Sequence, residues 1–282
     1  METTWGTPVA ANQQFGIDTN IESYSVEKTL ERSKGIGRRE SCFIKKGKIT
    51  RMISVSFDVT DASPAWVVAV FNKTTGTPTN LWSADATPAS LTIKRSVSTG
   101  TGATVETFSG CMARTLSFSS SEDEMGLRAT LEFEVKDYNT TTGTELEYTC
   151  TGSPLLFTDA IFKIDTTSYP LVNSFTADVT SNVTYKYGTS AAPQARGVGM
   201  NEYTLSFDHY LTDTQGMQAL ADEEDELTGV VEFTGANGSK FLINFAGASF
   251  ATYDTSNIDD SDVIESVTLW PKSLTIGYTA GT

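Results

Sequence analysis

His209 is the only histidine in the chain, and this limits the catalytic and metal-binding chemistry that the sequence can support. A Ser-His-Asp triad needs a histidine between two partners, and zinc sites usually draw on several histidines or cysteines. His209 also shares strand parity with Leu205 and Phe207, which predicts a structural, partly buried side chain. We therefore expect no catalytic residue, no metal site and no cofactor, and an enzyme is the least favoured class of function.

A second group with possible chemistry is an acidic loop near the C-terminus, made of Asp254, Asp259, Asp260 and Asp262. Carboxylate oxygens are ligands that Ca²⁺ accepts, but the spacing is not that of an EF-hand loop and no Glu occupies the twelfth position. A solvated turn is the favoured interpretation. Gly35-Ile-Gly37 and Arg196-Gly-Val-Gly199 lack the strand-to-helix context of a nucleotide-binding loop, so they too predict turns.

The three cysteines, Cys42, Cys111 and Cys150, are odd in number and lack CxxC spacing. They indicate neither a disulfide framework nor a zinc site, and a reducing compartment fits best. The longest apolar run, Ala65 to Phe71, is too short for a transmembrane helix, and the first residues lack a basic region followed by an apolar one. We expect a soluble, unsecreted protein without a membrane anchor.

A basic segment from Lys28 to Arg51 holds nine basic residues against Glu31 and Glu40. Its centre is long for a hairpin connection, and loops of that length tend to be functional or disordered. A protein-to-protein arm is the favoured interpretation, while a DNA contact or a plain solvated loop stays open. The candidate arm residues are Lys34, Arg38, Arg39, Lys45, Lys46 and Lys48. The corresponding loop of the second half, Tyr187 to Gly199, is also long.

Acidic residues dominate the rest of the chain, and the net charge of the whole chain is −15. Residues 1–152 hold 15 basic and 18 acidic side chains, and the remainder holds 5 basic and 17 acidic ones. This balance opposes tight binding to nucleic acid, although an acidic wall past which DNA slides is compatible with it. The acidic run Asp222, Glu223, Glu224, Asp225 and Glu226 is either a solvated face or a partner surface for the basic arm of another subunit.

Strand patterns cover most of the chain. The clearest is Leu127 to Lys136, where apolar and polar residues alternate and place Glu132 and Glu134 on the polar face. Turn-forming residues between the strands predict antiparallel sandwiches or small barrels. The other expected strands are 22–30, 50–59, 90–97, 105–118, 175–185, 203–210, 230–234, 241–245 and 266–278, with a further possible strand at 145–150.

The same plan occurs twice along the chain. Phe15-Gly-Ile-Asp18 recurs as Phe162-Lys-Ile-Asp165, Ser23-Tyr-Ser25 as Ser174-Phe-Thr176, and Ile53 to Asp58 as Tyr203 to Asp208. After each Ser-Phe-Asp strand a short helix is predicted, first at Ala65 to Asn72 with Ser63 as its cap, then from Asp213 through Ala221. Three matches in register argue for a tandem duplication with domains at 1–145 and 146–282.

In this order of elements the chain resembles the tail tube proteins of long-tailed bacteriophages, in particular those with two tube domains in one polypeptide. In each half, Tyr24-Ser-Val26 or Phe175-Thr-Ala177 lies in a strand and a long arm follows. The next strand closes with Ser56-Phe-Asp58 or Ser206-Phe-Asp208, and a short helix and further strands complete the sandwich. The resemblance covers about residues 15–278, and no single motif in it is diagnostic.

The resemblance implies a mainly β fold of two tandem antiparallel sandwich or tube domains, whose inner sheets join those of neighbours into a β-barrel channel. It implies three chains per pseudo-hexameric ring, with a hexamer as a variant, and rings that stack into a tube for DNA ejection. Implied partners are further copies of the chain and the tape-measure, tail-tip or baseplate and terminator proteins, with DNA as a non-sticking passenger. The implied location is the virion tail, assembled in the host bacterial cytoplasm.

Within this interpretation the basic arm reaches a neighbouring subunit or ring, and Glu132 and Glu134 are candidates for facing the channel, although an outer face is equally allowed by the alternation alone. The main alternative comes from a different class. It is a two-domain immunoglobulin-like decoration or surface-binding module, which would stay monomeric or form one closed oligomer and present an aromatic patch to its ligand.

Overall fold

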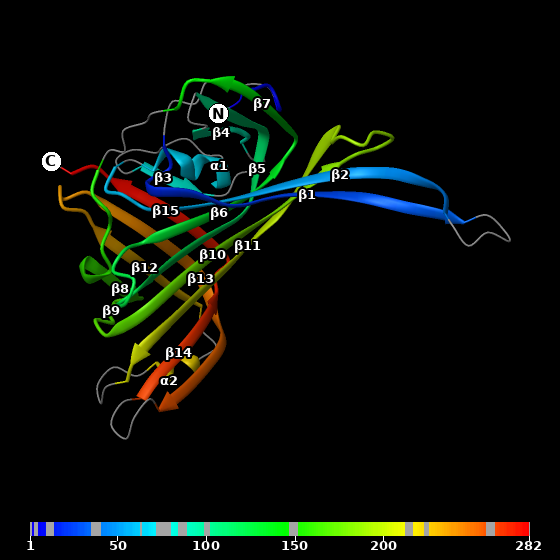
Figure 1. Ribbon diagram of the computed structural model, residues 1–282. Helices are drawn as coiled ribbons and strands as arrows, with labels where there is room; N and C mark the ends of the chain where they lie inside the picture. The colour runs from blue at the N-terminus through cyan, green and yellow to red at the C-terminus, as the bar shows by residue number, and fades with distance from the viewer. Residues whose placement is uncertain are drawn as a thin grey trace.

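The computed structural model describes residues 2, 5–9, 14–34, 41–62, 64–71, 80–83, 89–98, 102–146, 152–211, 217–222, 226–257 and 263–281. These residues form a mainly β protein in which fifteen strands join one large antiparallel sheet that does not close into a barrel (Figure 1). The mainly β, antiparallel class expected from the alternation is therefore confirmed.

The strands are β1 (Ile17–Lys34), β2 (Ser41–Asp58), β3 (Asn80–Ser83), β4 (Leu91–Ser98), β5 (Ala103–Ser121), β6 (Arg128–Val135), β7 (Asp137–Gly143), β8 (Ala160–Ile164), β9 (Thr167–Ser168), β10 (Val172–Lys186), β11 (Ala195–Tyr210), β12 (Leu227–Thr234), β13 (Lys240–Asn257), β14 (Val263–Trp270) and β15 (Ser273–Thr279). The helical elements are single turns, the 3₁₀ turns η1 (Ala65–Val67) and η2 (Phe157–Asp159) and the α-helical turns α1 (Val68–Phe71) and α2 (Gln218–Ala221).

Eight of the strands lie side by side in the order β1-β2-β6-β5-β10-β11-β14-β13, which we call the inner row. Within it the first half contributes β1-β2-β6-β5 and the second half contributes β10-β11-β14-β13, so the order is the same in both halves. The pairing of β5 with β10 joins the halves into one sheet. The strand order is thus repeated, and the duplication, with its boundary between residues 145 and 146, stays a prediction.

The long strands β5 and β13 each bend out of the inner row into an outer layer. The outer part of β5 pairs with β4 and β7, and the outer part of β13 pairs with β12 and β15. Each bend has a glycine in the left-handed region, Gly110 with φ 65° and Gly247 with φ 62°. Glycine adopts such a φ at no steric cost, so these two positions let the chain pass from one layer to the other.

The core lies between the inner row and the outer layer. Phe57, Phe118, Phe133 and Phe175 point into it from the inner row and are at most 1% exposed. Apolar residues of both halves belong to the same buried cluster. In the first half the helical turns lie over this face, where Trp66 packs against Phe57 with ring centroids 4.9 Å apart. Alternation of period two thus gives the inner row one apolar and one polar face.

Several expected boundaries were wrong. The expected strand 266–278 is two strands, because Pro271 cannot donate a ladder hydrogen bond and the chain turns there from β14 into β15. β13 runs on to Asn257, twelve residues beyond the expected end, since Gly247 bends the strand without ending it. The first arm is a β-hairpin and not an irregular loop, as β1 reaches Lys34 and β2 resumes at Ser41. The possible strand 145–150 falls partly outside the described residues, and residues 145 and 146 are not in a strand.

The pairing also corrects the register of one repeat motif. Ile53 and Tyr203 occupy the same place relative to the aspartate of each Ser-Phe-Asp sequence. Tyr24 lies opposite Ile53, whereas Val179, and not Phe175, lies opposite Tyr203. The likeness of Ser23-Tyr-Ser25 to Ser174-Phe-Thr176 is therefore out of register with the strand pairing, since Tyr24 corresponds to Val179, four residues beyond Phe175.

Candidate functional site

The polar face of the inner row is coated with short hydroxyl side chains and carboxylates. Directly paired residues point to the same side of an antiparallel sheet, so the register assigns this face residue by residue. Its hydroxyl-bearing residues include Ser54, Ser56, Thr130, Ser117, Ser119, Thr176, Thr204, Ser206, Ser266 and Thr268. Its carboxylates on paired positions include Asp58, Glu132, Asp178, Glu202, Asp208 and Asp254. Among the described residues of this face, the carboxylates outnumber the two guanidinium groups, those of Arg114 and Arg128.

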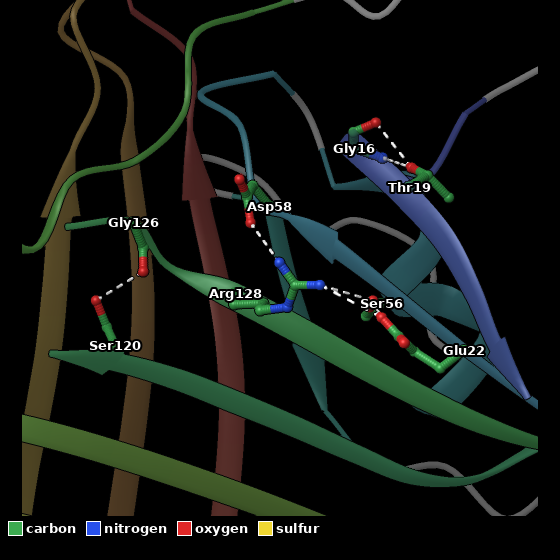
Figure 2. Close-up of polar contacts among 8 residues, drawn as sticks. All are labelled: Gly16, Thr19, Glu22, Ser56, Asp58, Ser120, Gly126 and Arg128. Atoms are coloured by element: carbon green, nitrogen blue, oxygen red, sulfur yellow. Dashed lines mark hydrogen bonds and ion pairs between the residues drawn. The ribbon is translucent and has the colours of Figure 1, made fainter. Parts of the chain in front are cut away.

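One ion-pair network holds the edge strand β1 to this face (Figure 2). Arg128 Nη2 donates to Ser56 Oγ at 2.9 Å and lies 3.4 Å from Glu22 Oε1, and Arg128 Nη1 lies 3.5 Å from Asp58 Oδ1. Ser56 Oγ in turn donates to Glu22. The hydrogen bond from Ser56 holds the pKa of Glu22 below its usual value, whereas burial raises the pKa of Asp58 against the effect of Arg128.

The second half lacks this cation. There Ser174 Oγ donates to Asp208 at 2.8 Å, and Ser266 occupies the strand position that Arg128 has in the first half. The carboxylate of Asp208 therefore has a hydroxyl partner where Asp58 has a guanidinium. The polar face is more negative in the second half than in the first.

The inner row ends in two free strand edges. β1 pairs only with β2, and the terminal part of β13, residues 249–257, pairs only with β14 among the described residues. A strand edge presents a row of unpaired N–H and C=O groups and is a template for pairing with another chain. Both edges carry bulges, between Ile21 and Ser23 in β1 and between Phe250 and Thr252 in β13.

The hairpin of β1 and β2 projects far beyond the body of the protein (Figure 1), and the loop after β10 braces its base. Ile49 N donates to Ala191 O at 3.0 Å, Thr50 Oγ1 lies 3.3 Å from Tyr187 Oη, and Lys48 Nζ lies 5.7 Å from the Tyr187 ring centroid. The hairpin also exposes apolar side chains, namely Val26, Leu30 and Ile44. It is thus a braced, extended arm with an apolar as well as a basic surface.

The structure spreads the candidate arm residues along this hairpin. Lys34 ends β1, Lys45 and Lys46 lie in β2, and Lys48 is exposed near the base. Arg38 and Arg39 lie outside the described residues. Of the acidic run, Asp222 is exposed after α2, Glu226 makes an ion pair with Lys272 of the same chain, and residues 223–225 lie outside the described residues.

Glu132 and Glu134 differ in exposure. Glu132 is exposed on the polar face and its Oε2 accepts a hydrogen bond from Thr115 at 3.3 Å. Glu134 is only 6% exposed, because the hydroxyls of Tyr185 and Tyr187 approach its backbone oxygen at 2.7 Å and its carboxylate at 3.5 Å. Burial raises the pKa of Glu134. Of the two candidates, only Glu132 presents an accessible charge on this face.

Sequence reasoning missed an N-terminal hook that closes the bend at Gly110. Glu2 accepts hydrogen bonds from Gly6 N, Ser90 Oγ, Thr92 Oγ1 and Gly110 N, all at 2.8–2.9 Å. Lys136 Nζ lies over the indole of Trp5, 4.2 Å from the centroid of that ring. The repeat carried a sequence signal for these bends. Gly110 is followed by Lys136 and Gly247 by Lys272 at nearly equal spacing, and each lysine lies against its glycine.

His209 is fully buried, beyond the partly buried position that its strand parity predicted, and belongs to a polar cluster beside α2. Its Nδ1 lies 3.4 Å from Glu265 Oε2, while Glu265 Oε1 accepts from Tyr253 Oη at 2.6 Å and from Met217 N at 3.1 Å. Desolvation lowers the pKa of His209 below its usual value. The cluster ties the α2 segment to β11, β13 and β14.

The described part of the chain has no group of three or more metal-ligating side chains that could hold an ion. No described helix is long and apolar enough to cross a membrane. Among the hollows lined by described residues, the most apolar lies inside the core of the second half, between Phe162, Val231 and Phe245. The features that stand out are therefore surfaces: a polar sheet face, two free edges and a projecting arm.

Comparison with known proteins gives one family. A family model described as "Phage tail tube protein" matches residues 1–280. No curated protein matches the chain.

Proposed function

The chain belongs to the phage tail tube protein family, and from that premise we propose that three copies close a ring through their free strand edges and that stacked rings form the channel for DNA ejection. As a member of this family it is a structural component of the virion tail that assembles with itself into a tube. The observation that carries the proposal is the pairing of β5 with β10, which joins the two halves inside the chain. We take this pairing as the template for the junction between chains.

The template follows from the repeated strand order. In the inner row β5 ends the first half and β10 begins the second, while the free part of β13 ends the second half and β1 begins the first. Pairing of β13 with β1 of the next subunit would then repeat the pairing of β5 with β10. Phe118 of β5 lies opposite Ala177 of β10, and Tyr253 and Ile21 hold the corresponding positions on β13 and β1. The same register would therefore place Tyr253 opposite Ile21 of the next subunit, and Asp254 opposite Asn20.

Ring size follows from the strand count. Each chain contributes the eight strands of the inner row, so three chains close a barrel of 24 strands. With strands about 4.8 Å apart and tilted by about 40°, such a barrel is about 50 Å wide between backbones. Six chains would give about 100 Å by the same arithmetic. The narrower channel still admits a DNA duplex and leaves less empty width around it, which favours three chains.

In this arrangement the polar face of the inner row lines the channel. The apolar face is already covered by the outer layer, so the polar face is the one free to meet solvent. Its carboxylates, including Glu132 and Asp178, repel DNA phosphates, and its hydroxyl groups offer no fixed positive charge to hold them. DNA would then pass as a non-sticking passenger.

The braced arm would reach the adjacent ring. Its basic residues, Lys34, Arg38, Arg39, Lys45, Lys46 and Lys48, would dock on acidic surface of that ring near the run 222–226. Glu226 already has Lys272 as a partner, so Asp222 and residues 223–225 are the better candidates for this contact. Tape-measure, tail-tip or baseplate and terminator proteins would be the other partners, and assembly would take place in the host cytoplasm.

The duplication into domains 1–145 and 146–282 belongs to the same proposal, since it gives a ring of three chains its pseudo-sixfold symmetry. The alternative of a decoration or surface-binding module is not carried further, because the family match spans nearly the whole chain.

A paired cysteine variant tests both the edge pairing and the number of chains. Asn20→Cys with Asp254→Cys places two thiols opposite each other across the proposed junction, at a separation that a disulfide accepts. We expect oxidation of assembled protein to give a ladder that stops at three linked chains on a denaturing gel, and electron microscopy to show stacked hollow rings. A ladder continuing to six would replace the trimer by a hexamer.

The two single-cysteine variants are the control for links through the native cysteines, of which Cys111 is buried. Stacked rings without a specific cross-link would refute the proposed edge pairing. Protein that never forms rings, even with a tail initiator complex present, would refute the tube itself.

A further inference from the structure

The two halves of the chain bury different side chains at equivalent places of the inner row. The alignment of the halves starts from Arg128 and Ser266, which lie opposite the aspartate of each Ser-Phe-Asp sequence. Counting along the strands from these two residues aligns three further positions of the apolar face, Val59 with His209, Leu127 with Glu265, and Phe118 with Tyr253. At each of these positions an apolar side chain of the first half corresponds to one with a polar group in the second.

The polar pair of the second half is as deeply buried as the apolar pair of the first. His209 and Glu265 are 0% exposed, and Val59 and Leu127 are at most 1% exposed. Taking an ionisable pair out of water is costly, and apolar side chains of similar volume are often as stable in its place. The first half shows that valine and leucine suit these two positions of the fold. The buried pair of the second half therefore needs a role beyond packing.

That role concerns Tyr253, which lies on the free edge of the inner row. Glu265 Oε1 accepts a hydrogen bond from Tyr253 Oη at 2.6 Å. The same carboxylate accepts from Met217 N at 3.1 and 3.2 Å and lies 3.4 Å from His209 Nδ1. The hydroxyl of an edge residue is thus fastened to a carboxylate that the α2 segment and β11 hold in place.

Phe118 needs no such fastening, because its strand has a neighbour on each side. β5 lies between β6 and β10, and both Phe118 and its β10 partner Ala177 are 0% exposed. Tyr253 lies in residues 249–257 of β13, which pair only with β14 among the described residues, and its side chain is partly exposed. Without its hydrogen bond, the Tyr253 ring at this open edge could turn away from the apolar face.

We propose that Glu265 is a positioning residue for ring assembly, which holds the Tyr253 ring on the apolar face of the free edge, where Ile21 of the next subunit meets it. The inference rests on the proposed function, since it needs β13 and β1 of neighbouring chains to pair. The occupant of the edge is a second copy of this chain, because Tyr253 and Ile21 hold the places of Phe118 and Ala177 in the junction inside the chain.

A side chain that is fixed in advance favours assembly through entropy. A side chain that becomes ordered only on association reduces the binding free energy, and this cost is avoided when it is already held in the bound conformation. The Tyr253 hydroxyl points to Glu265 of its own subunit, so removing it leaves the ring that meets the next subunit in place. Loss of the hydroxyl would therefore weaken assembly without removing contact surface between chains.

Tyr253→Phe tests the inference, because it removes the hydroxyl and keeps the ring. We expect the protein concentration needed for ring assembly to rise about two- to tenfold, the factor that corresponds to ordering one side chain on association. Glu265→Gln offers Tyr253 a neutral amide, a weaker acceptor than a carboxylate. It should raise the threshold in otherwise wild-type protein and add nothing in Tyr253→Phe. Sedimentation over a concentration series measures the threshold, and electron microscopy identifies the rings.

The matched control is Tyr278→Phe, which removes a hydrogen bond of the same kind from β15 in the outer layer. Tyr278 Oη donates to Asp61 O at 3.0 Å, and β15 belongs to neither free edge of the inner row. This variant should leave the assembly threshold unchanged. Circular dichroism and urea unfolding of every variant restrict the comparison to conditions in which the monomer is folded.

The outcomes separate a positioning role from a purely structural one. A hydroxyl that only stabilised the fold would lower the urea midpoint of Tyr253→Phe and leave its assembly threshold as in wild type. That result, or additive effects of Glu265→Gln and Tyr253→Phe on the threshold, would overturn the inference and leave the tube intact. Wild-type protein that forms no rings would overturn the proposed function and this inference with it.

Discussion

Gly110 and Gly247 hold the same backbone conformation at the two bends, but their surroundings differ in a way that a single substitution can measure. A Cβ at Gly110 would lie 2.6 Å from Lys136 Cβ and 3.1 Å from Trp5 Nε1. A Cβ at Gly247 would lie 3.0 Å from Lys272 Cδ and 3.1 Å from Lys272 Cβ, so its approach to the lysine Cβ is 0.5 Å less close than at Gly110. The left-handed conformation costs an alanine about 1–2 kcal/mol at either site.

We therefore predict that Gly110→Ala lowers the free energy of unfolding more than Gly247→Ala does. At Gly247 the loss should be about 1–2 kcal/mol, because the exposed end of the Lys272 side chain can move away and Lys272 Cβ lies at 3.1 Å, not 2.6 Å. At Gly110 it should exceed about 2 kcal/mol, because the base of the Lys136 side chain is fixed by β6 and by the N-terminal hook. Urea unfolding of the three proteins measures the difference. Equal losses at the two sites would show that the hook contributes nothing to the rigidity of the first bend.

At the scale of elements, the His209 cluster is the joint between the α2 segment and three strands. The side chains and groups that face His209 are Glu265 from β14, the Tyr169 ring at 5.4 Å and, through Glu265, Tyr253 from β13 and the backbone of Met217. Desolvation is the larger effect on the pKa of His209 and lowers it, while Glu265 opposes this by favouring the charged form. Burial, and then the same carboxylate, raise the pKa of Tyr253 to about 12.

The sign of the pH effect follows from this direction. Below about pH 6.5 an unfolded histidine takes up a proton that the folded His209 resists, so the unfolded state is favoured as pH falls. We predict that wild type loses stability between about pH 7 and pH 5, and that His209→Gln flattens this part of the profile. Urea unfolding at fixed ionic strength across that range provides the measurement. Parallel profiles for the two proteins would mean that Glu265 compensates the desolvation fully.

Strands were predictable from the sequence where alternation was uninterrupted, and less so where one strand serves two layers. β6 has four apolar residues in strict alternation and lies where it was expected. β13 was recognised only up to Phe245, because Ala246-Gly-Ala-Ser249 carries no alternation although the strand continues through it. The burial of Glu134 was equally out of reach, since its cover comes from Tyr185 and Tyr187 of the other half. Local pattern determines a strand, whereas cover from distant residues determines which carboxylate stays exposed.

At the scale of the whole molecule, the charge of the chain is divided between surfaces. Basic residues concentrate on the projecting arm, and carboxylates line the polar face and the region after α2. In the proposed tube, negative charge on the channel face repels DNA, and positive charge on the arm attracts the acidic surface of the next ring. The two effects need charges of opposite sign on separate surfaces, because a field of one sign over the whole molecule would provide only one of them. Salt screens such contacts within about 10 Å at 0.1 M ionic strength, so stacking through the arm should weaken as salt rises.

Charge reversal on the arm separates ring closure from ring stacking. Changing Lys45, Lys46 and Lys48 to Glu leaves the paired edges at Ile21 and Tyr253 untouched, so single rings should still close. The reversed arm would now face acidic surface of the adjacent ring, and like charges at an interface cost enough to suppress association. We predict free rings and few or short tubes, scored by electron microscopy at low and high salt. Reversal of Lys94 and Lys163, which lie on β4 and β8 of the outer layer, is the control and should leave tube length as in wild type. Tubes of wild-type length from the arm variant would refute the electrostatic contact between rings, and the apolar residues Val26, Leu30 and Ile44 would then be the part of the arm to test next.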